Sequence, residues 1–327
     1  MNIPIQQLFS AHSPVRFEQL ALDIFRYQAT ANKVYASFVK NLGIDIPAVR
    51  QIEQIPFLPI GFFKSHDVIC DDAKPQIVFT SSGTTGMVQS RHLVTDVSLY
   101  ERSYLAAFNH FYDDVSHYAI LALLPSYQER EGSSLIYMTD DLIRRSNHTE
   151  SGYFLYNQHD LYQTLQNLKA LQIPTILLGV TYALLDFIEQ YTVDFPELIV
   201  METGGMKGRR KEMIRTELHQ LLCKGFGVTA IHSEYGMTEL LSQAYSKSDG
   251  IFRCPGWMKV LLRDTNDPLS LIEHGHTGGI NVIDLANIHS CSFIATQDLG
   301  KLYPDDSFEV IGRFDNSDIR GCNLLVQ

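Results

Sequence analysis

Seven small residues in a row are the first feature of this chain that could do chemistry. They combine hydroxyl side chains and two glycines without any charge: Thr80, Ser81, Ser82, Gly83, Thr84, Thr85 and Gly86. Hydroxyl groups and inward-turned backbone N–H groups suit the oxygens of a phosphate. No Gly-Lys-Ser/Thr follows, so the stretch is not a Walker motif. An ordinary turn can have the same composition.

A second polar stretch, HSEYGMTE at residues 232–239, offers groups that would complement a phosphate loop. The Tyr235 ring can stack on a base, the Thr238 hydroxyl can donate to a phosphate, and the Glu239 carboxylate can hold Mg²⁺. Each residue also has a structural role open to it. Tyr235 can be a core residue, Thr238 a helix N-cap, and Glu239 a first-turn carboxylate.

The C-terminal part adds a carboxylate and a cation. Asp298, in the sequence ATQDLG, is expected at the end of a strand, where it can accept both hydroxyls of a ribose. Arg313, in IGRFDNSDIRG, carries a forked guanidinium that suits a phosphate or ribose oxygen.

The elements that must position these groups alternate along the chain. Residues 16–41 have helical periodicity, and from residue 76 short apolar runs alternate with amphipathic helices. This alternation predicts an α/β fold with mostly parallel strands covered by helices. The expected strands are 76–80, 118–125, 152–156, 174–180, 197–202 and 228–236, and the expected helices are 96–112, 133–145, 159–172, 181–191 and 209–224.

After about residue 250 the helical patterns stop, and a strand-rich part follows. The expected division is an N-terminal helical segment at 1–75 packed on the core, an α/β nucleotide-binding core at 76–249, and a strand-rich part with a short tail at 250–327, together forming one compact unit. In open parallel sheets, ligands bind beyond the carboxyl ends of the strands. The polar stretches at 80–86, 203–208 and 233–239 each follow an expected strand.

Composition narrows the function. The formal net charge of −11 among 327 residues argues against a nucleic acid as partner. The N-terminus lacks the pattern of a secretory signal, and no apolar window is long enough to span a bilayer. The chain has 5 scattered cysteines without a CxxC pair, which indicates a reducing compartment. We therefore expect a cytoplasmic protein.

The four motifs FTSSGTTG, SEYGMTE, QDLG and GRFDNSDIRG resemble, in order and approximate spacing, those of the adenylate-forming superfamily of acyl-CoA synthetases, luciferases and adenylation domains. The resemblance covers residues 80 to 322. It implies the large N-terminal domain of that fold, with ATP and Mg²⁺ as cofactors. Within the superfamily the chain looks most like the LuxE-type acyl-protein synthetases, which activate a fatty acid and pass it to a protein thiol.

The resemblance also implies roles for individual residues. Thr80 to Gly86 would cradle the β- and γ-phosphates, and Thr238 would touch the α-phosphate. Glu239 would hold the metal, Asp298 the ribose, and Arg313 the ribose or a phosphate. The adenine slot would be formed by Gly204, Gly205, Met206 and Tyr235, together with Gly236 beside it.

The chain departs from most of the superfamily at its C-terminus, because the motifs are not followed by the mobile lid whose lysine drives adenylation. LuxE-type synthetases share this feature and are thought to accept the acyl group on a cysteine near the C-terminus, where this chain has Cys322. A buried structural role for Cys322 is an equal alternative. The expected enzyme is thus an AMP-forming acid–thiol ligase with a carboxylic acid substrate and an acyl-acceptor or reductase protein as partner.

Two alternatives stay open on sequence alone. In the first, the thiol belongs to CoA or to a carrier pantetheine. In the second, the chain is an inactive nucleotide-binding subunit of a complex. A hydrolase that uses a serine of the TSSG stretch is disfavoured, because no GxSxG sequence accompanies it.

Overall fold

The computed structural model describes residues 5–9, 13–82, 88–125, 132–204 and 213–314 of the chain. Its contacts divide the chain into two compact units. The first unit consists of Met1–Ser103, Thr238–Ser242 and Arg253–Gln327, and the second of Tyr104–Met237 and Gln243–Phe252. The sequence-based division at residues 75 and 249 stays a prediction. Within the described ranges, no helix has the length and apolar character needed to cross a membrane.

The N-terminal helical region of the first unit is divided at Asn32. Helix α2 (Pro14–Ala31) begins after Ser13, whose hydroxyl accepts a hydrogen bond from the Arg16 N–H. Helix α3 (Lys33–Asn41) begins with the buried Asn32, whose side chain accepts hydrogen bonds from two backbone N–H groups. The single helical pattern predicted at 16–41 is therefore two helices, because Asn caps a helix better than it continues one.

An antiparallel sheet forms the centre of the first unit. Its strand order is β11-β12-β13-β14, with the short strand β1 parallel to β13. The predicted strands of the C-terminal part are confirmed as far as the structure describes them. Their bounds are β1 (Leu58–Pro59), β11 (Met258–Arg263), β12 (Thr277–Asp284), β13 (Phe293–Leu302) and β14 (Phe308–Arg313). The remaining short helices of this unit are α1 (Ile5–Leu8), η1 (Ile46–Ala48), η2 (Ile52–Gln54), α4 (Phe62–Ser65) and η4 (Leu285–Asn287).

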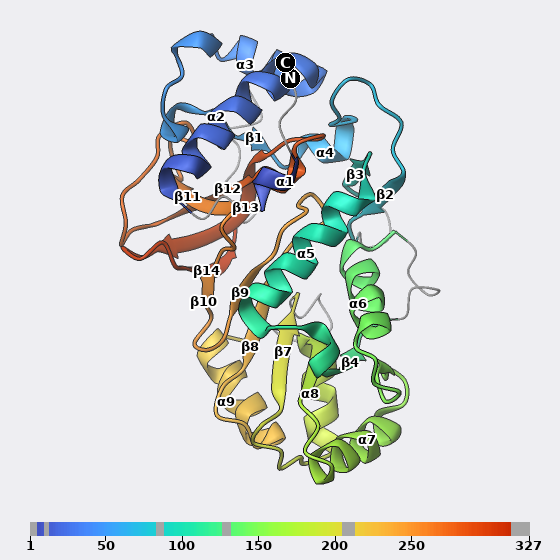
Figure 1. The fold of residues 1–327 in the computed structure, drawn as a ribbon. Helices are drawn as coiled ribbons and strands as arrows, with labels where there is room; N and C mark the ends of the chain where they lie inside the picture. The colour runs from blue at the N-terminus through green and yellow to red at the C-terminus, as the bar shows by residue number, and fades with distance from the viewer. Residues whose placement is uncertain (1–4, 10–12, 83–87, 126–131, 205–212, 315–327) are drawn as a thin grey trace. The chain divides into compact units, whose positions relative to one another are not determined.

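Helix α2 is joined to this sheet by a fully buried glutamine. The Gln28 Nε2 atom donates to the carbonyl oxygens of Asn287 at 3.0 Å and Ile288 at 2.9 Å. The Gln28 Oε1 atom accepts from the Ser292 backbone N–H at 2.9 Å. In Figure 1 the blue N-terminal helices accordingly lie beside the orange strands from the end of the chain. Gln28 thus satisfies backbone groups that burial would otherwise leave unpaired.

One expected parallel strand is antiparallel. Strand β2 (Ile77–Thr80) pairs with β3 (Arg91–Val94) in a separate two-stranded sheet, with Thr80 opposite Arg91. The prediction that residues 76–80 start the parallel series was wrong. Parallel neighbours need a long crossover, whereas the short segment between β2 and β3 allows a hairpin.

The second unit contains the parallel sheet. The strand order is β5-β4-β6-β7-β8-β9-β10, and neighbours from β5 to β8 are parallel. Strand β9 turns back antiparallel to β8. The strands are β4 (Ala119–Leu123), β5 (Gly152–Tyr153), β6 (Thr175–Val180), β7 (Ile199–Thr203), β8 (His232–Tyr235), β9 (Ala244–Ser246) and β10 (Ile251–Arg253).

Helices between these strands complete the predicted alternation (Figure 1). Strands β4 and β6 consist entirely of buried residues, as expected for strands covered on both faces. This confirms the predicted α/β class. The helices are α5 (Val97–Tyr112), α6 (Ser134–Arg145), α7 (Gln158–Ala170), α8 (Thr181–Gln190) and α9 (Arg215–Phe226).

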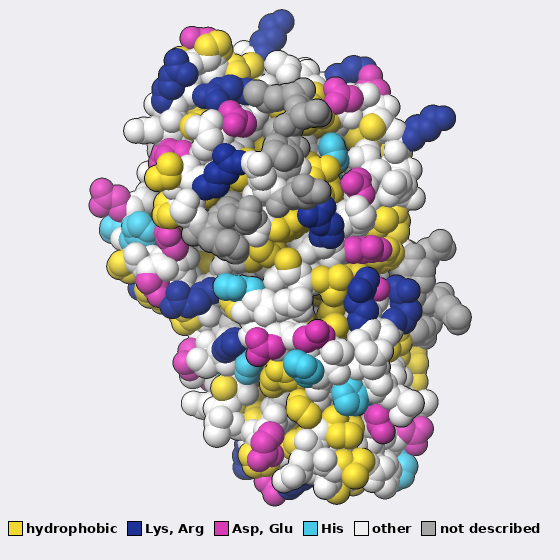
Figure 2. Space-filling model, viewed as in Figure 1, with side chains coloured by type: hydrophobic (Ala, Val, Ile, Leu, Met, Phe, Trp, Pro, Cys, Tyr) yellow, Lys and Arg dark blue, Asp and Glu magenta, His cyan; other side chains and the backbone are white. Residues whose placement is uncertain are grey.

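The coloured surface in Figure 2 mixes charges of both signs. On this face Lys and Arg side chains stand among Asp and Glu side chains, and the described residues form no continuous basic area there.

We expect Gln28→Ala to lower the free energy of unfolding by about 2 kcal/mol, because it leaves buried backbone groups of Asn287, Ile288 and Ser292 unpaired. Urea unfolding followed by circular dichroism measures the change. The exposed Gln19→Ala on the same helix is the control and is expected to stay within about 0.5 kcal/mol of wild type. Equal effects of the two variants would contradict the anchoring role of Gln28.

Candidate active site

The β2–β3 hairpin positions the ends of the predicted phosphate loop. The Ser81 backbone N–H donates to the Ser90 carbonyl at 3.1 Å, and the Ser90 N–H donates to the Ser81 hydroxyl oxygen at 2.9 Å. Thr80 is the last residue of β2, and Ser82 follows Ser81 outside the strand. Residues 83–86 of the loop lie outside the described residues. The structure therefore defines where the loop leaves and rejoins the fold.

Glu239 lies against this hairpin in the first unit. The residue is 5% exposed. Burial raises the pKa of Glu239, while the nearby Ser90 hydroxyl, the residue's own N–H and the positive charges of Lys64 and Arg313 act against that rise. The carboxylate predicted to hold a metal thus lies near Ser90, the residue that pairs with Ser81 at the base of the predicted phosphate loop.

The donor set at Glu239 fits a magnesium ion that is bound mainly by phosphate oxygens. Within the ranges that the structure describes, no three His, Cys, Asp or Glu side chains converge in a way that could hold a metal. Magnesium in nucleotide sites is usually held by one or two protein carboxylates together with phosphates and water. A single carboxylate beside a phosphate loop meets this requirement.

Two residues that the sequence analysis missed hold the backbone of the Thr238–Glu239 segment. The His92 Nδ1 atom lies 2.8 Å from the Thr238 carbonyl oxygen, and the Asn287 Nδ2 atom donates to the Glu239 carbonyl at 2.8 Å. His92 Nε2 lies 3.0 Å from Asn287 Oδ1. Burial lowers the pKa of His92 to about 4, although both of these contacts raise it. The only signal in the sequence was a histidine within an apolar strand.

A third missed residue, Asp284, fixes the residues that follow Glu239. Its carboxylate accepts hydrogen bonds from the backbone N–H groups of Leu241 at 2.8 Å and Ser242 at 3.0 Å. It also accepts from the Ser242 hydroxyl at 2.6 Å and the Ala286 N–H at 3.1 Å. Burial raises the pKa of Asp284 to about 6, against the effect of these bonds. A carboxylate at the end of an apolar strand was the available signal.

Asp298 and Arg313 lie opposite each other on β13 and β14. The Arg313 Nε atom donates to Asp298 Oδ1 at 3.1 Å, with side chains that are 82% and 9% exposed respectively. The pair joins a mostly exposed guanidinium to a buried carboxylate, so water screens it from the Arg313 side. Asp298 is within β13 rather than at its end as predicted, because pairing of Leu302 with Phe308 extends the strand.

The predicted adenine residues of the second unit follow neighbouring parallel strands. Thr203 at the end of β7 pairs with Glu234 in β8, so Gly204 and Tyr235 are at the carboxyl ends of adjacent strands. Gly204 has a φ of 69°, which glycine adopts without strain. The Tyr235 ring is 8% exposed, and its centroid lies 5.9 Å from that of Phe252. Gly205 and Met206 lie outside the described residues, as does Cys322.

Two buried carboxylates support these strand ends. Burial opposes ionisation of Glu202, but hydrogen bonds from His219 and Thr181 and the charge of Arg215 keep its pKa below the usual value. Glu234 accepts a hydrogen bond from the Thr203 hydroxyl at 2.5 Å, and burial raises its pKa to about 7. The two carboxylates therefore differ in charge near neutral pH.

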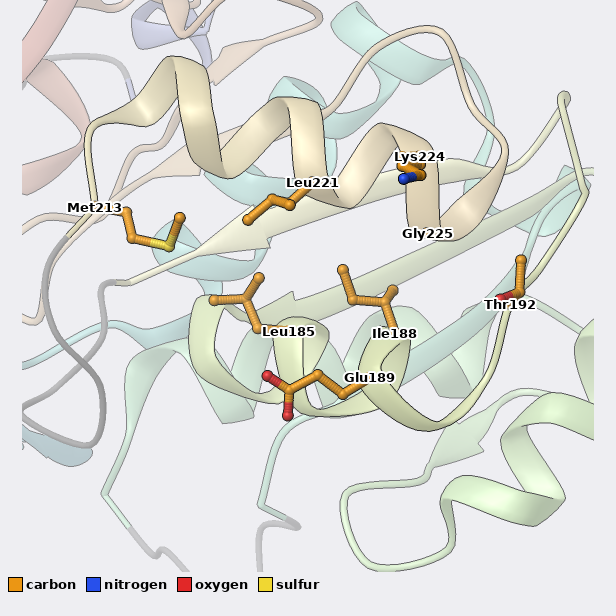
Figure 3. A pocket seen from close by; sticks show the side chains of 8 residues that line it. All are labelled: Leu185, Ile188, Glu189, Thr192, Met213, Leu221, Lys224 and Gly225. Atoms are coloured by element: carbon orange, nitrogen blue, oxygen red, sulfur yellow. The ribbon is translucent and has the colours of Figure 1, made fainter.

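A separate groove of about 660 Å³ lies between α8 and α9 in the second unit. Figure 3 shows aliphatic side chains of both helices directed into it, with Glu189 and Lys224 also lining it. None of the residues predicted for nucleotide binding lines the groove. Its apolar members are Leu185, Ile188, Met213 and Leu221.

Replacing Glu234 by Gln is expected to change how stability depends on pH. Because its pKa is about 7 in the folded protein against 4.5 ordinarily, the folded state holds a proton that the unfolded chain has lost. Wild type should therefore lose about 2 kcal/mol relative to Glu234→Gln between about pH 5 and about pH 8. Urea unfolding at both pH values measures this loss, with the exposed Glu197→Gln as control. Parallel pH profiles for wild type and Glu234→Gln would contradict it.

No model of a protein family matches this chain, and no curated protein matches its sequence. Solved structures do match. ATP-bound MatB from Rhodopseudomonas palustris aligns over 74% of this chain and 49% of its own, at 16% identity and a TM-score of 0.55. The chain thus spans about half the length of MatB.

A 2-hydroxyisobutyryl-CoA ligase aligns over more of the chain. Its postadenylation structure with 2-HIB-AMP covers 92% of this chain and 68% of its own, at 11% identity and a TM-score of 0.69. Its thioesterification structure, which contains 2-HIB-AMP and CoA, covers 95% and 71%, at 11% identity and a TM-score of 0.68. At these identities the likeness concerns the fold. The chain has the α/β fold of the adenylate-forming acyl-CoA ligases.

Proposed function

We propose that this protein is an AMP-forming acid–thiol ligase, which activates a carboxylic acid with ATP and passes the acyl group to a thiol. The observation that carries the proposal is the contact between His92 of the β2–β3 hairpin and the segment of the buried Glu239, in which His92 Nδ1 lies 2.8 Å from the Thr238 carbonyl oxygen. It joins the proposed metal residue to the hairpin of the proposed phosphate loop within one compact unit. The fold supports the same reading, since the ligases reported above share it.

In the first step, a carboxylate oxygen of the acid attacks the α-phosphorus of ATP, and the bond to the pyrophosphate oxygen breaks. Thr80 to Gly86 donate hydrogen bonds to the β- and γ-phosphates, and Thr238 donates to the α-phosphate. Gly204 to Met206, with Tyr235 and Gly236, hold the adenine, while Asp298 accepts the ribose hydroxyls. Fixed donors of this kind stabilise the charge that develops on the phosphate oxygens.

Glu239 would hold Mg²⁺, which supplies positive charge to the triphosphate and the leaving pyrophosphate. His92 and Asn287 orient Glu239 through the carbonyl groups of residues 238 and 239. Arg313 moves from Asp298 to a phosphate or ribose oxygen of the nucleotide. The mostly exposed guanidinium makes this exchange inexpensive.

In the second step, a thiol sulfur attacks the carbonyl carbon of the acyl-adenylate, AMP leaves, and the thiol proton passes to solvent. Our preferred acceptor is Cys322 of this chain, with a fatty acid as substrate, as in LuxE-type synthetases. An acceptor or reductase protein would then take the acyl group onward. The alternative acceptor is CoA, and it is favoured by the likeness to a ligase whose structure contains 2-HIB-AMP together with CoA.

Glu239→Gln is expected to reduce acid-dependent pyrophosphate release by about 100-fold or more, because it removes the negative charge that holds the metal. A coupled pyrophosphate assay with a panel of carboxylic acids measures the rate, and circular dichroism checks the fold. The exposed Glu273→Gln in the same unit serves as control and should retain the wild-type rate. A wild-type rate in Glu239→Gln would remove the metal assignment.

Cys322→Ser is expected to retain pyrophosphate release but to lose the acyl adduct on the protein, because the serine hydroxyl is a far weaker nucleophile than a thiolate. Mass measurement of the intact protein after reaction, with and without hydroxylamine, detects the thioester. Cys223→Ser is the control and should keep the adduct. Full turnover of Cys322→Ser with added CoA would instead identify CoA as the acceptor.

A further inference from the structure

A group of buried polar side chains lies beside the proposed nucleotide site without a role in the mechanism above. Its members are Thr203, Glu234 and Gln243, which are 5%, 8% and 4% exposed. Thr203 and Glu234 are the chain neighbours of Gly204 and Tyr235, the residues proposed to hold adenine. Gly236, which follows Tyr235, is two residues before Thr238, the residue proposed to touch the α-phosphate that the acid attacks. All three members of the group belong to the second unit.

Strand pairing brings these side chains to one face. Thr203 pairs with Glu234, and Tyr235 pairs with Ala244, so Gly236 and Gln243 are the next residues opposite each other. Because side chains alternate along a strand, Glu234 and Gln243 share the face opposite to that of Tyr235. The Gly236 position confirms the closeness, since a Cβ atom there would lie 2.3 Å from Glu234 Oε1 and 3.3 Å from Gln243 Cγ.

Gly236 is exposed, and because it has no side chain, the Glu234 carboxyl group lies directly beside its exposed backbone. Any larger residue at position 236 would collide with the Glu234 carboxyl group. Glycine at such a position allows another molecule to come close to the backbone. The exposed Gly236 thus lies over two buried polar groups, which is the arrangement expected where a ligand enters.

The Gln243 Oε1 atom is buried and accepts no hydrogen bond from any residue that the structure describes. Leaving a buried acceptor unpaired is unfavourable, and native structures seldom do so without a missing partner. The partner must carry an N–H or O–H donor. Glu234, whose pKa burial raises to about 7, is in large part a neutral carboxyl group near neutral pH and can itself donate a hydrogen bond.

One acceptor beside one donor matches a hydroxyl group, which donates once and accepts readily. An ammonium group fits less well, because it brings three donors and a charge that must be desolvated. The Thr203 hydroxyl does not compete for the ligand, since it donates to Glu234 Oε2.

We propose that Glu234 and Gln243 determine substrate specificity by hydrogen-bonding a hydroxyl group of the carboxylic acid. This proposal rests on the proposed function, because it concerns the acid that the same site activates. A hydroxylated aliphatic acid has a hydroxyl group for the polar pair, and it also has the apolar chain expected of a fatty acid. Neither residue acts on the reacting atoms, so both are specificity residues rather than catalytic ones.

The test compares butanoic, hexanoic, octanoic and dodecanoic acids, each with its hydroxy and amino counterparts. The ratio of kcat/KM for pyrophosphate release, hydroxy acid over unsubstituted acid, is expected to be about 10 or more in wild type. Gln243→Leu and Glu234→Leu should bring this ratio close to one, mainly through KM of the hydroxy acid. Glu234→Gln keeps a donor at the same place and should keep most of the preference.

Gln158→Leu is the matched control, because the Gln158 Oε1 atom is likewise buried without a hydrogen-bond partner but lies at the start of α7. It should leave the ratio unchanged. A ratio near one in wild type, a preference for the amino acid, or unchanged ratios in both leucine variants would overturn the proposal.

Measuring the binding of the acids distinguishes failure of the specificity role from failure of the ligase function. Thermal shift with each acid and with ATP measures binding without turnover. If no acid releases pyrophosphate, the ligase function fails, while tighter binding of the hydroxy acid that Gln243→Leu abolishes still supports the specificity role. If pyrophosphate is released but hydroxy and unsubstituted acids bind and react alike, the ligase function stands and the specificity role is overturned.

Discussion

The candidate site depends on how the backbone at residues 238–242 is held. This five-residue segment belongs to the first unit, although the residues on both sides of it belong to the second. It has no regular secondary structure of its own beyond a turn. Its backbone groups instead bond to His92, Asn287 and Asp284. Irregular backbone of this kind keeps one conformation only where side chains satisfy its polar groups.

Burial acts differently on the carboxylates around the site. Asp284 and Glu239 are surrounded by donors or positive charges that oppose the rise in pKa caused by burial. Glu202 has enough partners that its pKa falls below the usual value. Glu234 accepts a hydrogen bond from the Thr203 hydroxyl, and burial raises its pKa to about 7. Neighbouring strand ends thus carry one ionised carboxylate and one that is about half protonated at pH 7.

The sequence alone predicts the α/β class and most strands and helices, because apolar periodicity reports directly on which faces are buried. It does not predict that β2 pairs with β3, because the apolar pattern of one strand does not show which other strand it pairs with. The motif residues Ser81, Glu239 and Asp298 were recognisable because their types and order are unusual. His92, Asp284 and Asn287 were not, because a polar residue inside an apolar run gives no sign of what it bonds.

The closeness of Gln243 and Glu234 is a second feature that the sequence alone does not predict. Each residue is ordinary in its stretch of sequence, and their closeness appears only when β9 turns back along β8. Gly236 belongs to the predicted nucleotide motif. Its closeness to the buried Gln243 side chain depends on the cross-strand pairing of β8 with β9, which the motif does not predict.

The bonds of Gln28 also affect the order in which the chain acquires its structure. This side chain in α2 bonds to residues 259 and 260 positions further along. The first unit therefore cannot close before residues 287 and 288 have been synthesised, and contacts across so long a loop form late and slowly. The parallel sheet, whose strands succeed one another at short intervals, can assemble before then. Gln28 in α2 has to wait for its partners until that late stage of folding.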